Sequence, residues 1–281
     1  MLLLLLASPL ARLMQAPEEA FGETVAYLRI CGAGTLFIVA FNVLGSIFRG
    51  IGDANMPLIT VAIACVVNIA GDLLLVAVCK MGAAGAAIAT VAAQAISVLV
   101  SLLLIARREL PFRLRRADIR LESRQTGAIL RVGIPLAVQD FLVSVSFAVI
   151  LAIINSLGLT YSAGIGVAEK ICAFIMLVPS AYMQSMSAFV AQNIGAGRPD
   201  RAKQALRCGI LTAVAASLVL AYVSYFHGTA LAQIFANEQA VILAAADYLR
   251  AYAIDCVLTS FLFCFIGYFS GLGKTTFVLI Q

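Results

Sequence analysis

The sequence predicts an all-α polytopic membrane protein, and composition, segment length and an internal repeat all lead to that class. Hydrophobic residues make up 63% of the 281 residues and charged residues only 12%, with a mean hydropathy of +1.03. Soluble domains contain roughly 45–50% apolar and about 25% charged residues. The apolar runs are about 20 residues long, the length with which a helix spans the hydrocarbon, and they lack the alternation of membrane strands. We therefore expect spanning helices.

Charges, prolines and glycines divide the chain into one incomplete span and a series of full ones. The incomplete span covers residues 1 to about 14. The full spans are expected near 25–48, 57–79, 82–105, 129–156, 162–191, 208–226 and 248–270, and another begins after Lys274. The N-terminal leucine run lacks the basic segment of a signal peptide, so we interpret it as the remainder of a helix.

One segment of the chain recurs 221 positions later without a gap, from 27 to 248. The first copy begins at Tyr27-Leu28-Arg29 and includes Phe48-Arg49-Gly50-Ile51-Gly52. The second begins at Tyr248-Leu249-Arg250 and includes Phe269-Ser270-Gly271-Leu272-Gly273. Such repeats are typical of transporters built from two homologous halves. We therefore expect two homologous six-helix lobes, and interpret this sequence as a fragment truncated at both ends.

Lysine and arginine gather in alternate loops, which the positive-inside rule places in the cytoplasm. The longest of these loops is rich in arginine between Arg107 and Arg124. It divides the chain into an N-terminal lobe, residues 1–106, a basic cytoplasmic linker, 107–127, and a C-terminal lobe, 128–281. We expect the linker to contact anionic membrane lipids rather than nucleic acid, and the protein to be a multi-pass protein of the plasma membrane.

Two glycine-containing segments end apolar spans on this basic side. Their residues are Arg49, Gly50 and Gly52 in the first, and Gln192, Asn193, Gly195 and Gly197 in the second. A cation is favoured at a helix C-terminus by the helix dipole and by anionic lipid, and glycine permits a tight reversal of the chain. We interpret both segments as turns of a hinge or gate rather than as substrate contacts.

Asp72 is the strongest candidate for a functional residue. It lies within the span 57–79, where insertion scales assign a charged carboxylate a cost of about 2.5–3.5 kcal/mol. Asn68 lies one helical turn earlier on the same face, and a short loop at Lys80 brings Thr90 to a comparable depth. A carboxylate, an amide oxygen and a hydroxyl could bind Na+, or the acid could carry a proton. The alternative is a hydrogen-bonded contact between two helices.

Several motifs, in order, resemble those of multidrug and toxic compound extrusion (MATE) transporters. Phe48 to Asp53 with Pro57, Asn68 to Asp72, and Gly82 to Thr90 resemble the fourth to sixth helices of that family. Arg131-Val132-Gly133-Ile134-Pro135 resembles the opening of the seventh, and Gln192 to Gly197 with Arg201-Ala202 the signature after the eighth. The resemblance runs from about the end of the third helix to the start of the eleventh.

The resemblance implies a cation site at Asp72, Asn68 and Thr90, together with an aspartate on the first helix, which this sequence does not contain. Other branches carry cation-binding acids on the seventh and tenth helices. The usual places there correspond to Val143 and Thr259, which are not acids. The alternative polar site of the second half consists of Asp255, Gln139 and Asp140. We favour the first-half site, and interpret Glu169 and Lys170 as a neutralised pair.

We expect a secondary active exporter that moves amphipathic, often cationic drugs outward in exchange for Na+ or H+, acting as a monomer at full length. The first alternative is a flippase for lipid-linked precursors in the same superfamily. It would need a cluster of basic residues for pyrophosphate, and no span has one. The second is a membrane receptor or scaffold without transport, which leaves the repeat unexplained. We expect neither enzymatic activity nor a cofactor, since no nucleophile elbow is present and His227 is the single histidine.

Overall fold

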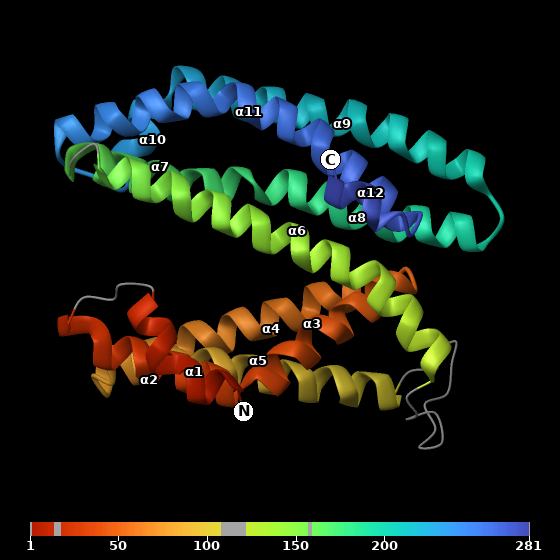
Figure 1. The fold of residues 1–281 in the computed structure, drawn as a ribbon, viewed down its shortest axis with the longest axis horizontal. Coiled ribbons are helices and arrows are strands. Elements are labelled where there is room, and N and C mark those ends of the chain that lie inside the picture. The colour runs from red at the N-terminus through yellow and green to blue at the C-terminus, as the bar shows by residue number, and fades with distance from the viewer. Residues whose placement is uncertain (1, 14–17, 108–121, 157–158, 281) are drawn as a thin grey trace. The chain divides into compact units, whose positions relative to one another are not determined.

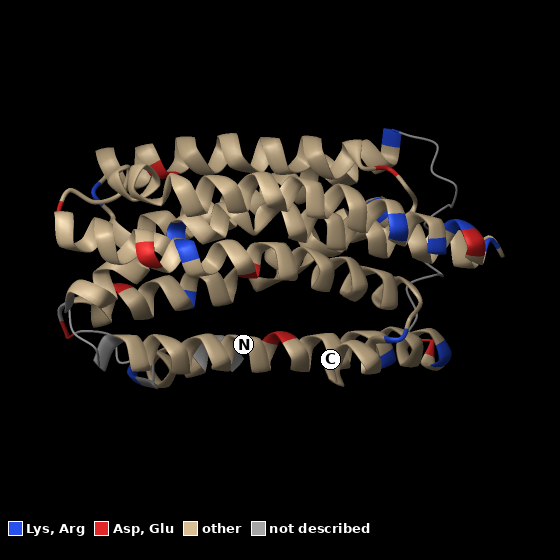
Figure 2. Ribbon diagram, turned by 90° about the horizontal axis from the view of Figure 1, so that it is seen from above, with Lys and Arg blue, Asp and Glu red and all other residues tan. Residues whose placement is uncertain are grey.

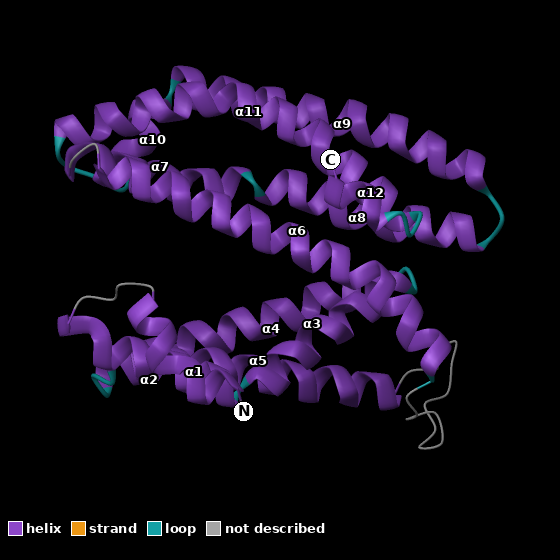
Figure 3. Ribbon diagram, viewed as in Figure 1, coloured by secondary structure: helices purple, strands orange, loops and turns teal. Residues whose placement is uncertain are grey.

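The computed structural model describes residues 2–13, 18–107, 122–156 and 159–280, and Figures 1 and 3 show these residues as helices joined by short turns. The chain divides into two compact units, which we call the first lobe, Met1–Ile119, and the second lobe, Arg120–Gln281. Within the described residues, six helices are long and apolar enough to cross a membrane, or seven spans if one bent pair counts as a single span. The all-helical membrane fold predicted from composition is confirmed.

The first lobe is built around a helical hairpin. Its elements are α1, Leu2–Leu13; α2, Glu18–Ala33; α3, Thr35–Gly50; α4, Asn55–Asp72; the π-helix η1, Leu73–Val78; and α5, Gly82–Arg107. Helix α5 packs against α4, α2 and α3, so it forms the centre of this lobe. Small residues allow the hairpin to close tightly, because a Cβ added at Gly71 would lie 2.9 Å from the Cβ of Ala89.

The span predicted at 25–48 is broken at Gly34. Helices α2 and α3 meet there at 56°, and a side chain at Gly34 would collide with Val91 of α5. Glycine is therefore the residue that lets the bend approach α5 closely. At the other end of the hairpin, the Glu23 carboxylate accepts the backbone N–H of Ala83 at 3.4 Å. This places a negative charge at the N-terminus of α5, where the helix dipole favours it.

The second lobe surrounds one long helix. Its elements are α6, Ser123–Ser156; α7, Leu159–Ile175; α8, Leu177–Gly195; α9, Pro199–Phe226; α10, Gly228–Gln233; α11, Gln239–Gly271; and α12, Thr275–Ile280. Helix α11 packs against α7, α8 and α9, and its buried core includes Val241, Leu249 and Cys256. Helices α7 and α8 continue one span with a break at Met176.

The 221-residue repeat is preserved in the backbone. In the first copy the N–H of Gly52 bonds the carbonyl of Arg49 at 3.1 Å, and the N–H of Asp53 bonds that of Phe48 at 3.0 Å. The equivalent bonds of Gly273 and Lys274 both measure 2.9 Å. This is the Schellman arrangement, which requires a left-handed residue after the helix, and φ is +90° at Gly52 and +71° at Gly273. Both copies therefore end their helix in the same way.

The charged residues lie mainly toward helix ends, whereas the middle stretches of the helices carry few of them, as Figure 2 shows. The predicted basic linker, 107–127, falls mostly outside the described residues, between the end of α5 at Arg107 and the start of α6 at Ser123. Helix α6 thus begins before residue 128, where we expected the second lobe to start. Helices α9 and α11 likewise begin earlier than predicted, at Pro199 and Gln239. For α9 the reason is that its first two turns are too polar for a hydropathy pattern.

Candidate functional site

Asp72 lies where the backbone of the first lobe changes its helical period. It is the last residue of α4, and the π-helix η1 begins at Leu73. Single π-helical turns occur frequently at functional sites. The side chain is half-buried, and its Oδ1 atom is fully buried without a hydrogen-bond partner among the described residues. A buried carboxylate oxygen without a hydrogen bond is costly, so a ligand that contacts it would offset that cost.

Asn68 and Thr90 meet beside Asp72 across the helical hairpin. The side-chain amide of Asn68 donates to the Thr90 hydroxyl at 3.3 Å, and that hydroxyl donates to the carbonyl of Ala86 at 2.9 Å. The close approach of Gly71 to Ala89 brings the two helices together at this level. Because Asn68 donates its N–H, its amide oxygen is available to a cation. The structure thus brings two of the three predicted ligands into contact, with the third one turn away on α4.

Two further polar residues belong to this part of the first lobe. The Tyr27 side chain on α2 forms a hydrogen bond with Cys31 and interacts electrostatically with Asp72. The Oε1 atom of Gln94, one turn after Thr90 on α5, is fully buried and has no partner in the part of the chain that the structure describes. Sequence reasoning missed both. Gln94 could have been identified, because it lies four residues after Thr90 and therefore on the same face of the helix. No local sequence pattern identified Tyr27.

The donor set of the first lobe suits a light cation or a proton. Asp72, Asn68 and Thr90 offer oxygen atoms, and hard cations prefer oxygen ligands. The described residues contain no group of three or more His, Cys, Asp or Glu side chains arranged to hold a metal ion. One carboxylate with neutral oxygens fits a single positive charge.

The structure separates the residues of the alternative second-half site. Asp255 on α11 accepts a hydrogen bond from the Thr259 hydroxyl at 3.2 Å. Gln139 on α6 instead lines a cavity with Leu262 and Ile266, about two and three turns further along α11, and with Val278 of α12. Asp140 is exposed. A polar site formed by Asp255, Gln139 and Asp140 together stays a prediction, and no hydrogen bond between these three side chains is found among the described residues.

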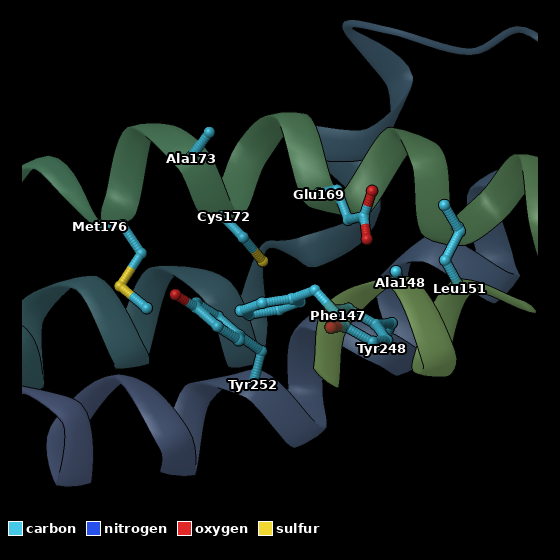
Figure 4. Close-up of a pocket in the computed structure, with 9 residues that line it drawn as sticks. All are labelled: Phe147, Ala148, Leu151, Glu169, Cys172, Ala173, Met176, Tyr248 and Tyr252. Atoms are coloured by element: carbon cyan, nitrogen blue, oxygen red, sulfur yellow. The ribbon is translucent and has the colours of Figure 1, made fainter. Parts of the chain in front are cut away.

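Glu169 and Lys170 do not neutralise each other. The Lys170 ammonium lies 6.0 Å from the ring centroid of Phe235, whereas Glu169 lines a different cavity, between α6, α7 and α11. Consecutive helical residues differ by about 100° in direction, so neighbours in sequence face different surroundings. Figure 4 shows the Glu169 carboxylate on the α7 face that carries Cys172, opposite Tyr248 and Tyr252, with Met176 just after the end of α7.

The two predicted gate segments are well-defined turns. Arg49 donates from Nη2 to the Ser46 hydroxyl at 3.1 Å within α3, next to Gly50 and the left-handed Gly52. At the end of α8, Asn193 is 8% exposed and donates its side-chain amide to the Phe189 carbonyl at 2.8 Å. Gln192 accepts the N–H of Ala196 at 3.0 Å, and Gly195 and Gly197 close the turn with φ of +68° at the latter.

Comparison with known proteins agrees with this arrangement of two related lobes. The MatE family model matches residues 1–74 and 135–281, one match in each lobe. The chain belongs to the MatE family. The resemblance inferred from the sequence motifs is thereby confirmed, as is a multi-pass membrane protein of a transporter family.

Relatives of this MatE chain carry names connected with export. It is 30% identical over 197 residues to the probable multidrug resistance protein YpnP of Bacillus subtilis. The aligned residues make up 70% of this chain and 44% of the relative. It is 23% identical to the multidrug export protein MepA of Staphylococcus saprophyticus, over 97% of this chain and 61% of the relative. A FAD transporter of Shewanella oneidensis is 27% identical, over 83% of this chain and 53% of the relative. The MatE chain thus spans about half the length of these relatives.

Solved structures show the same fold. A transporter of the MOP superfamily from Pyrococcus furiosus superimposes with a TM-score of 0.92 at 23% identity, over 99% of this chain and 62% of that one. A MATE crystal structure in the straight conformation gives a TM-score of 0.91 at 23% identity, over 99% and 62% of the two chains. The MatE chain therefore has the backbone arrangement of these transporters.

Proposed function

We propose that the complete protein is a secondary active exporter of amphipathic, often cationic compounds, driven by inward movement of Na+ or H+. The observation that carries this proposal is the buried Asp72 Oδ1 atom without a partner, next to the Asn68–Thr90 contact. An intramembrane acid that no cation neutralises is costly unless an ion or a proton occupies it during function. Family membership and the names of the relatives support export as the work of the whole protein.

The coupling step follows from differential binding. A cation or proton bound at Asp72 neutralises the carboxylate and favours closer packing of α4 and α5, whereas the empty site retains a negative charge that attracts water and organic cations. A ligand shifts a conformational equilibrium only by its difference in affinity for the two states. Occupancy of Asp72 would therefore favour the state that releases drug outward. We place the protein in the plasma membrane with the basic linker in the cytoplasm, and expect it to act as a monomer.

The test is ethidium efflux in everted vesicles that contain the full-length protein. Asp72→Asn has the same size but can neither exchange a proton nor carry a negative charge, so we expect loss of gradient-driven transport with normal membrane insertion. Asp247→Asn is the matched control, because Asp247 is exposed and, among the described residues, forms an ion pair only with Arg250 on the same helix. Imposing a Na+ gradient and a pH gradient separately identifies the coupling ion. Wild-type efflux by Asp72→Asn would refute the assignment.

A further inference from the structure

The span that carries Asp72 contains a short π-helix, η1, from Leu73 to Val78. A π-helical turn takes about one residue more than an α-helical turn, because its hydrogen bonds join residues i and i+5 rather than i and i+4. The N–H of Cys79 accordingly bonds the carbonyl of Leu74 at 2.9 Å. The span therefore holds about one residue in excess of a regular α-helix, directly after its acidic side chain.

The C-terminal end of η1 is held by the turn that follows it. The N–H of Met81 bonds the carbonyl of Leu75 at 2.9 Å, and a Cβ added at Gly85 of α5 would lie 3.1 Å from the same carbonyl group. Between them, Lys80 has φ of +53°, the one positive value at a non-glycine residue among those described. Such a conformation persists only where the surrounding contacts impose it. A change of register within the span therefore cannot pass beyond this turn.

The residues of η1 are not packed into the lobe. None of its six residues is buried, and Leu73 and Val78 are 62% and 72% exposed. Earlier in the span, in contrast, the Ser97 hydroxyl of α5 donates to the Thr60 carbonyl of α4 at 3.0 Å, and both side chains are buried. The segment between these two fixed points, 61–78, is the part of the span that can change its helical register.

The charges around Asp72 leave its own occupancy as the variable quantity. Helix α4 packs against α5, α3 and η1, and the charged residues of these elements are Arg107 and Arg49, each in the last turn of its helix. Cys65, the other titratable group of α4, is exposed. Tyr27 of α2 is the titratable group that interacts with Asp72. A bound cation or proton therefore makes the largest change of charge at this level of the span.

A shift of the π-helix toward the N-terminus would place the extra residue before Asp72 instead of after it. Asp72 would then turn by about 100° around the helix axis, and Ala70 would take the place of Gly71 against Ala89. Even a Cβ at Gly71 would lie 2.9 Å from that of Ala89, so α4 and α5 would have to separate there. The number of backbone hydrogen bonds is the same in both registers, because each contains one π-helix.

We propose that the π-helix moves along this span as the coupling ion leaves and returns, so that Asp72 is alternately buried and turned outward. A buried carboxylate oxygen without a partner is costly. The empty acid therefore favours the shifted register, whereas a cation or proton at Asp72 favours the described one. This inference rests on the proposed coupling at Asp72. It supplies the conformational step, because the shifted register separates α4 from α5 beside the site.

The test is disulfide trapping between α4 and α5 in the full-length protein, freed of native cysteines and purified in detergent. Ala70 and Ile69 are both exposed in the described register, so neither is directed at Ala89. With copper phenanthroline as oxidant, we expect Ala70→Cys with Ala89→Cys to cross-link in alkaline buffer without Na+, where Asp72 is empty. Na+ or acidic buffer should lower the initial rate to that of the control pair, Ile69→Cys with Ala89→Cys.

Two variants connect this cross-link to the π-helix and to the acid. Deleting Val76 removes the extra residue, so the Ala70 pair should react at the control rate in every buffer and drug efflux should be lost. Val76→Ala retains the residue and should behave as wild type. Asp72→Asn should fix the described register with or without ions. Thermal unfolding shows whether the deletion variant is folded, and if it is not, the buffer dependence of the undeleted protein decides.

Cross-linking of the Ala70 pair at one rate in all buffers would overturn the proposal, and so would ion-dependent cross-linking that persists after deletion of Val76. The readout needs no transport. An ion-dependent register in a protein that moves no drug would therefore refute the export function and leave the conformational change established, whereas export with an invariant register would do the reverse.

Discussion

At the scale of single residues, several spans contain an acidic side chain that has no basic partner among the described residues. Asp72, Glu169 and Asp255 lie on three different spans. Asp255 accepts a hydrogen bond from the Thr259 hydroxyl, Glu169 lines a cavity with two tyrosines, and the Oδ1 atom of Asp72 has no partner among the described residues. Asp72 is half-buried, and Glu169 and Asp255 are exposed in the structure, so an amide of the same size at any of these positions breaks no ion pair with a described residue. Replacement by the matching amide should therefore impair function more than folding.

Tyr27 provides a prediction about the surroundings of Asp72. Tyr27→Phe retains the ring, which is 39% exposed, and removes only the hydroxyl that interacts with Asp72 and Cys31. One hydrogen bond is worth about 0.5–1.5 kcal/mol, so we expect efflux to fall about two- to tenfold with insertion unchanged. Initial rates in everted vesicles measure it. Tyr161→Phe, an exposed tyrosine of the second lobe, is the control, and an unaltered rate in Tyr27→Phe would exclude a role for the hydroxyl.

The sequence predicted part of the candidate site for a simple geometric reason. Asn68 and Asp72 are four residues apart on one helix, and a short reversal at Lys80 determines which residue of α5 they meet. Tyr27 could not be placed, because its position depends on the bend at Gly34, and apolar composition does not show where a helix bends. Glu169 and Lys170 were paired wrongly because adjacency along a chain was taken for adjacency in space.

At the scale of helices, the packing of α4 against α5 controls the site. Gly71→Ala would add a Cβ 2.9 Å from that of Ala89, so the helices must separate beside the Asn68–Thr90 contact. Overpacking of this kind costs about 1–3 kcal/mol. We expect a lower thermal unfolding temperature in detergent together with reduced efflux. Gly22→Ala is the control, since nothing lies within 4 Å of a Cβ there, and equal melting of both variants would contradict the prediction.

The left-handed glycines at helix ends give a second prediction at this scale. Gly52→Ala places a Cβ at φ +90°, which costs an L-residue about 1–2 kcal/mol. Gly50→Ala, two residues earlier and helical with open space around it, should be neutral or slightly stabilising because alanine favours helices. Thermal unfolding of the two variants measures the contrast. The sequence predicted these turns because glycine has a specific backbone role there, whereas the break at Met176 carries no such residue.

At the scale of the whole molecule, orientation follows from charge bias. In a cysteine-free background, a single cysteine in the linker 107–127 should resist an impermeant thiol reagent added to intact cells, whereas Glu238→Cys on the opposite side should react. Labelling of membrane fragments open on both sides is the control for reactivity. Rapid labelling of the linker from outside would reverse the topology.

The helical membrane class was predictable because hydropathy over long segments depends on composition alone. The contacts between polar residues within a lobe could not be predicted, because they depend on how helices that are far apart in sequence cross each other. The cavity beside Glu169 needs residues of α6, α7 and α11 together, and no local pattern contains all three.

One position of the repeat has a different residue and a different backbone conformation in each copy. Gly34 corresponds by the 221-residue offset to Asp255, yet α2 and α3 bend at the former while α11 runs straight through the latter. The helix end that follows is the same in both copies, down to its hydrogen bonds. The same place in the repeat is thus a bend in one half of the molecule and a carboxylate in the other, so the two halves share a helix end but not the part of the helix that precedes it.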